Sequence, residues 1–102
     1  MRLEHKSSAE LKREILEIAG RHLDLKKYRL FFFGSRVTNK GSDRSDIDIG
    51  IEGPQPVPAS VVVRLKEEIE KLPILYKIDI VDFAAASEKF KEVAKQYLEE
   101  IK

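Results

Sequence analysis

The chain has 102 residues, of which 42% are hydrophobic and 36% are charged, and its formal net charge at pH 7 is +1. This length and composition suit one small globular domain, which we expect to span residues 1–102. A net charge close to zero gives no general attraction for nucleic acid, so we expect no direct nucleic-acid binding. The absence of cysteine excludes thiolate metal sites and leaves oxygen and histidine ligands.

Membrane association is not expected either. No apolar run approaches the roughly 18 residues that are required to span a bilayer. The N-terminal stretch MRLEHKSSAE lacks the apolar centre of a signal peptide. These features predict a cytoplasmic protein.

The first half of the chain predicts a helix followed by two strands. Ser7 and Glu10 have the spacing of a capping box, and the apolar residues after them recur at helical intervals. An aromatic strand is expected at 28–33, where three consecutive phenylalanines indicate burial. A polar loop that can include one helical turn at 36–39 leads to a second strand at 46–52.

The second half predicts a helix, a strand and a final helix. The segment 53–58 contains three prolines and reads as a stiff connector. Helical spacing then continues to Pro73, and a third strand is expected at 75–83. Ser87 caps a last helix whose apolar positions continue to Ile101. The pattern indicates an α/β (α+β) domain, a small mixed three-stranded sheet packed with helices.

Two carboxylates and a Gly-Ser turn stand out on the first two strands. Successive side chains of a strand point to opposite faces, so Asp46 and Asp48 should project side by side. Two carboxylates at that spacing form half of a divalent-cation site. Gly34 and Ser35 end the aromatic strand and offer backbone N–H groups and a hydroxyl, which suit a phosphate. A metal site beside a phosphate site is the chemistry of nucleotidyl transfer.

The spacing of these residues resembles the signature of the polymerase-β-like nucleotidyltransferases. Gly34-Ser35 is followed by Ser45-Asp46-Ile47-Asp48, which begins eleven residues after the glycine. The pattern is most similar to the minimal nucleotidyltransferase (MNT) family of bacteria and archaea. The resemblance covers nearly the whole chain in element order, and its specific part is 31–51. It implies a nucleotidyltransferase fold.

The resemblance also implies roles for three carboxylates. Asp46 and Asp48 would hold two Mg²⁺ ions, while Asp79 matches the family's third carboxylate, which binds the second metal and receives or orients the nucleophile's proton. Asp82 is a nearby rival, but Asp79 has apolar neighbours and the family's alignment in its favour. The alternative is a solvated strand end. A pair of like charges 4 Å apart repels by about 4 kcal/mol at an effective dielectric of 20, which disfavours such a cluster without a cation.

The nucleotide, expected to be ATP, is assigned to the turn and the loop after it. Gly34 and Ser35 would contact the phosphates, although alone they would read as an ordinary turn. Arg36 is expected to clamp the triphosphate, with Arg44 as a weaker candidate, because arginine binds phosphate bidentately. Ser45 either contacts the nucleotide or braces the carboxylate strand.

One position departs from the family pattern. The family usually has a glycine five residues after the first, where this chain has Asn39, with Gly41 two residues further on. Asparagine is the non-glycine residue that best tolerates positive φ, so the turn can be preserved.

The resemblance implies a Mg²⁺-dependent enzyme that transfers AMP from ATP to a hydroxyl acceptor. Larger relatives carry a second, acceptor-binding domain, for which this chain is too short, so we expect an oligomer or hetero-oligomer with a partner. In the family this partner is a small helical HEPN toxin, whose tyrosine the MNT antitoxin adenylylates. A non-catalytic antitoxin that acts by binding alone stays open as an alternative. A small-molecule nucleotidyltransferase is the third candidate, without an identified acceptor pocket.

Overall fold

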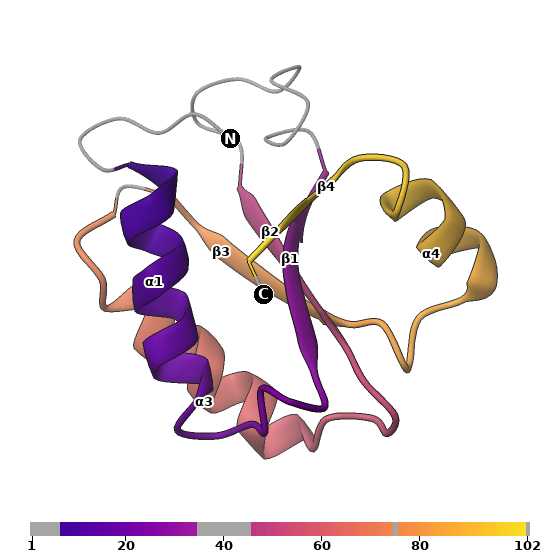
Figure 1. The fold of residues 1–102 in the computed structure, drawn as a ribbon, viewed down its shortest axis with the longest axis horizontal. Coiled ribbons are helices and arrows are strands. Elements are labelled where there is room, and N and C mark those ends of the chain that lie inside the picture. The colour runs from indigo at the N-terminus through magenta and orange to yellow at the C-terminus, as the bar shows by residue number, and fades with distance from the viewer. Residues whose placement is uncertain (1–6, 35–45, 75, 102) are drawn as a thin grey trace.

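The computed structural model describes residues 7–34, 46–74 and 76–101. Within these ranges, three helices and four strands follow one another as α1 (Ser8–Ala19), β1 (Arg29–Phe33), β2 (Ile47–Glu52), α3 (Ala59–Glu70), β3 (Ile78–Asp82), α4 (Glu88–Ala94) and β4 (Leu98–Glu100) (Figure 1). The expected helical turn at 36–39 lies outside the described residues. Within them, no helix is long and apolar enough to cross a membrane.

The four strands form one mixed sheet in the order β3-β2-β1-β4. Strand β1 is antiparallel to both of its neighbours, β2 and β4, whereas β2 and β3 run parallel. A parallel pair requires a crossover connection, and α3 provides it. Figure 1 shows β4 crossing in front of the upper part of β1.

The prediction of three strands was wrong, because β4 occupies the segment that was expected to continue the last helix. Helix α4 already ends at Ala94, and Leu98–Glu100 pairs with β1. The backbone N–H of Ile101 donates to the carbonyl of Leu30 at 2.9 Å. A strand edge carries unpaired N–H and C=O groups, and β4 supplies partners for those of β1.

The first helix forms as its sequence predicts. The Ser7 hydroxyl accepts a hydrogen bond from the Glu10 N–H at 3.1 Å, which satisfies one of the free donors at the helix start. The buried positions repeat at helical spacing and are Leu11, Ile15, Ile18 and Ala19. Helix α3 buries Leu65 and Ile69 in the same way. Both helices pack on one face of the sheet (Figure 1).

The opposite face of the sheet is covered by α4. Phe31, Phe33 and Phe83 form a separate apolar cluster there with Ala94 of α4, while Phe32 points into the larger core below α1 and α3. All three consecutive phenylalanines are buried, as the sequence predicted. The alternation matters for the site, because the odd-numbered residues of β1 share their face with the even-numbered residues of β2.

Candidate active site

Asp48 and Asp79 lie next to each other on the central and edge strands of the parallel pair. The register of β2 and β3 matches Asp48 with Asp79. Neighbouring strands are about 4.8 Å apart, and register partners project from the same face. The register therefore brings Asp79 beside Asp48, although the two residues are far apart in the chain. Asp46 is exposed and immediately precedes β2.

The three carboxylates share one electrostatic environment. Partial burial is the largest cause that raises the pKa of Asp48 from 3.8 to about 6, and the negative charges of Asp79 and Asp46 supply the rest of the rise. Burial disfavours the charged form of an acid, and nearby like charges act in the same direction. A bound cation would reverse both effects. The site is thus suited to a positively charged ligand.

The backbone of Gly34 lies directly against the Asp48 carboxylate. Its φ is +88°, a backbone conformation that residues with a side chain rarely adopt. A Cβ at this position would lie 2.6 Å from Oδ2 of Asp48. Glycine is therefore required both for the turn and for the space that the carboxylate occupies.

The other residues assigned to the nucleotide cannot be placed. Ser35, Arg36 and Ser45 lie outside the described residues, as do Arg44 and Asn39. Of that set, only Gly34 is placed, at the end of β1 beside Asp48. Their roles stay predictions from the sequence.

Asp82, the rival third carboxylate, is bonded elsewhere. Its Oδ2 accepts the backbone N–H of Val57 at 2.7 Å, and its Oδ1 accepts that of Ala84 at 3.0 Å. These bonds tie the connector before α3 to the turn after β3. The carboxylate of Asp82 thus has a structural use that Asp79 lacks, which favours Asp79 as the site residue.

Lys66 of α3 is a site neighbour that the sequence prediction missed. Its Nζ lies 3.9 Å from Oδ1 of Asp79. Buried Leu65 and Ile69 hold α3 against the sheet, so Lys66 emerges near the start of β3. Nothing in the sequence marks this lysine, because charged residues are ordinary on the solvent face of an amphipathic helix.

The carboxylates are the right type of ligand for a divalent cation, but too few of those in the described residues converge to surround one. Oxygen ligands suit Mg²⁺, and Asp48 and Asp79 are in register. In the described part of the chain, however, no three acidic, histidine or cysteine side chains converge closely enough to hold a metal ion. The raised pKa of Asp48, to which the charges of Asp79 and Asp46 contribute, is the observation that fits a cation at this position.

An aromatic cluster lies beside the site on the same face of the sheet. Phe33 is the register partner of Asp48, and its ring packs edge-on against Phe83, with centroids 5.3 Å apart. Phe90 of α4 packs on Phe33 at 5.9 Å. Gly50 makes this packing possible, because a Cβ there would lie 2.8 Å from Cε1 of Phe83 and closer still to Phe31.

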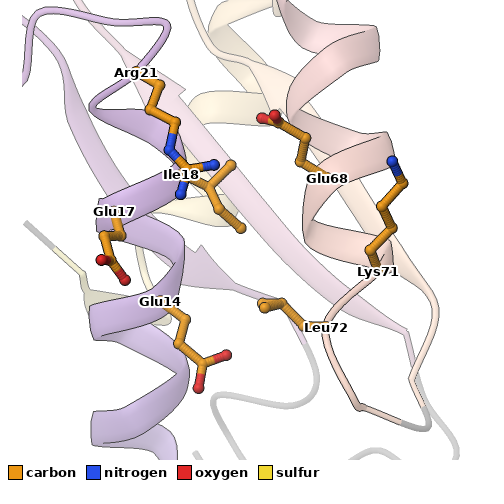
Figure 2. A pocket seen from close by; sticks show the side chains of 7 residues that line it. All are labelled: Glu14, Glu17, Ile18, Arg21, Glu68, Lys71 and Leu72. Atoms are coloured by element: carbon orange, nitrogen blue, oxygen red, sulfur yellow. The ribbon is translucent and has the colours of Figure 1, made fainter.

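A groove between α1 and α3 is separate from these carboxylates. It has a volume of about 360 Å³ and is lined by three glutamates, an arginine and a lysine around Ile18 and Leu72 (Figure 2). At one lining residue, Glu68, Oε2 lies 2.6 Å from Nε2 of His22, and this bond lowers the pKa of Glu68. His22 is thus hydrogen-bonded to a residue of α3. The groove lies on the face of the sheet that α1 and α3 cover, opposite the face that carries Asp48.

Known proteins share this fold and sequence pattern. Residues 13–100 match the family described as polymerase beta, nucleotidyltransferase. A relative from Haemophilus influenzae, named probable protein adenylyltransferase MntA, is 33% identical over 69 residues. That match covers 68% of this chain and 60% of the relative, so the chain spans less than two thirds of the relative's length.

Two solved structures resemble the fold at low sequence identity. A crystal structure of a toxin–antitoxin with AMP-PNP gives a TM-score of 0.74 at 18% identity, covering 89% of this chain and 72% of that chain. The structure of a tri-AMPylated Shewanella oneidensis HEPN toxin in complex with MNT antitoxin gives 0.70 at 16% identity, covering 91% and 70%. These two structures show the same fold. The family match over residues 13–100 shows that the chain belongs to the polymerase beta nucleotidyltransferase family.

Proposed function

We propose that this protein transfers AMP from ATP to a hydroxyl of a partner protein and thereby acts as an antitoxin. The observation that carries the proposal is the pairing of Asp48 with Asp79 on parallel strands, directly beside the glycine turn at Gly34. Family membership supports nucleotidyl transfer. The name of the Haemophilus influenzae relative, a probable protein adenylyltransferase, supports a protein acceptor.

The carboxylates have distinct roles in the proposed reaction. Asp46, Asp48 and Asp79 would hold two Mg²⁺ ions, which would supply positive charge to neutralise the triphosphate and the departing pyrophosphate and to activate the attacking hydroxyl. Asp79, on the exposed edge strand, orients the acceptor hydroxyl and receives its proton. This edge is open to an acceptor that approaches from outside, since the side chain of Asp79 is 59% exposed.

The nucleotide phosphates lie against the turn at the end of β1. Gly34 allows a close approach of the backbone, and Ser35, Arg36 and Ser45 complete the contacts to ATP. The partner is a HEPN-type toxin that presents a tyrosine, and the two chains form a hetero-oligomer in the cytoplasm. The similar solved complexes, one with AMP-PNP and one with an AMPylated HEPN toxin, support both the nucleotide and the partner.

Mass spectrometry of a reconstituted pair tests the proposal. The protein is mixed with a HEPN-type protein encoded beside it, ATP and Mg²⁺, and both chains are weighed intact. We expect AMP to be added to the partner by the wild type and by Glu92→Gln, which removes an exposed carboxylate from α4. Asp48→Asn should add none. Neutralisation of the toxin by Asp48→Asn as fully as by wild type, without added AMP, would instead establish the non-catalytic antitoxin.

A further inference from the structure

Lys66 places a positive charge at the acidic edge of the site. Its Nζ lies 3.9 Å from Oδ1 of Asp79, and the two side chains are 39% and 59% exposed. An ion pair so open and so long contributes little to folding. In the described residues, no other lysine or arginine comes within 4.0 Å of the carboxylate of Asp46, Asp48 or Asp79. Among the lysines and arginines of the described residues, Lys66 is thus the one that lies beside a carboxylate of the candidate site.

The packing of α3 fixes where the Lys66 side chain leaves the helix. Leu65 and Ile69, on either side of Lys66 in sequence, are each about 1% exposed and anchor the helix in the core. Asp79 in turn is held by the ladder that pairs it with Asp48. The backbone at both ends of the ion pair is thus rigid, and only the flexible lysine stem can move. A lysine of this kind can occupy a position near a carboxylate and leave it at little cost.

We propose that Lys66 is a positioning residue that takes the place of a metal cation at Asp79 when the site holds none, and competes with the divalent cation for that carboxylate. The inference rests on the proposed function in that Asp79 is taken as a metal ligand. In the metal-free protein, the ammonium group approaches the Asp79 carboxylate from the α3 side of the edge strand and partly neutralises its charge. A divalent cation that binds Asp79 must displace the ammonium group from this carboxylate.

Metal affinity without nucleotide is the measurement that tests this competition. Mn²⁺ binding is followed by electron paramagnetic resonance for the wild type and for Lys66→Met, which removes the charge but keeps most of the stem. We expect Lys66→Met to bind Mn²⁺ about three- to tenfold more tightly, because one nearby positive charge is gone. The difference should shrink as salt is added, because ions screen exposed charges. Lys66→Arg keeps the charge and should bind no more tightly than wild type.

Two further variants separate competition from a general effect. Lys71→Met removes an exposed lysine from the end of the same helix and should leave the Mn²⁺ affinity unchanged. In an Asp79→Asn background, Lys66→Met should no longer tighten binding, because the shared carboxylate is absent. Equal or weaker Mn²⁺ binding by Lys66→Met would overturn the inference while the proposed function stands. A wild-type protein that binds no Mn²⁺, with or without ATP, would overturn both.

Discussion

Asp48 and Asp79 are register partners in the parallel pairing of β2 and β3, so two carboxylates separated by a connector and a helix share one face of the sheet. The folded chain holds them together although the charge of Asp79 disfavours the ionisation of Asp48. Natural proteins retain such unfavourable local arrangements mainly where function requires them. The relationship therefore has consequences for stability as well as for activity.

Replacement of Asp48 by asparagine should stabilise the metal-free protein at neutral pH. The pKa of Asp48 is about 6 in the folded protein and 3.8 as its ordinary value, so the folded state holds this proton more tightly. The contribution of Asp48 to the free energy of unfolding is fully present below pH 3.8 and is lost as the pH rises through about 6. In EDTA, Asp48→Asn should gain about 1 kcal/mol at pH 8, after discount for solvent screening, and nothing at pH 3.

Chemical denaturation at several pH values measures this difference. Mg²⁺ with ATP should raise the stability of the wild type and have little effect on Asp48→Asn, since a ligand stabilises only the state that it binds. A gain that is the same at all pH values would show that the charge of Asp48 is not its source.

Alanine at position 34 should damage both the turn and the site. Its side chain would be forced into positive φ, which costs about 1–2 kcal/mol, and its Cβ would collide with the Asp48 carboxylate. We expect Gly34→Ala to lower the free energy of unfolding by at least that amount and to weaken ATP binding measured by calorimetry. Asp48→Ala in the same chain should recover only the part of the loss that comes from the collision. Full recovery would mean that the backbone conformation at position 34 is not strained.

Asp79 and Asp82 should respond in opposite ways to the same substitution. Asp79→Asn should keep its fold and its ATP binding but lose about 10²–10⁴ in transfer rate, the usual cost of removing a general base. Asp82→Asn should keep transfer but lose about 1–2 kcal/mol of stability, because an NH₂ group replaces one of the two oxygens that accept from Val57 and Ala84. Transfer assays and thermal unfolding on both variants distinguish the two roles. If Asp82→Asn is inactive and Asp79→Asn is active, then Asp82, and not Asp79, is the third carboxylate of the site.

A methyl group at position 50 should disrupt the aromatic support of the site. The rings of Phe31 and Phe83 leave no room for a Cβ on Gly50, so Gly50→Ala must push them apart. Overpacking of this kind typically costs about 1–3 kcal/mol. Urea denaturation should show this loss, and Phe83→Leu in the Gly50→Ala chain should return part of it. Unchanged stability of Gly50→Ala would mean that the rings have another place to pack.

Local features of the chain were readable from the sequence alone because a few neighbouring residues determine them. The cap at Ser7, the buried stripe of α1 and the burial of three phenylalanines all follow from short-range periodicity and capping. The shared facing of Asp46 and Asp48 stays a prediction, because Asp46 precedes β2. The sequence signature was sufficient to identify the family, which the match over 13–100 confirms.

Tertiary structure alone decided β4 and the neighbour of Asp79. Leu98 and Ile101 are three residues apart, which suits one face of a helix, yet in the structure they enter the two different cores on opposite faces of the sheet. The free edge of β1 settles the choice, since pairing satisfies backbone groups that a longer α4 would leave without partners. Likewise, Lys66 reaches Asp79 only because the crossover lays α3 against β3. Contacts between distant segments depend on packing, and no local pattern in the sequence specifies them.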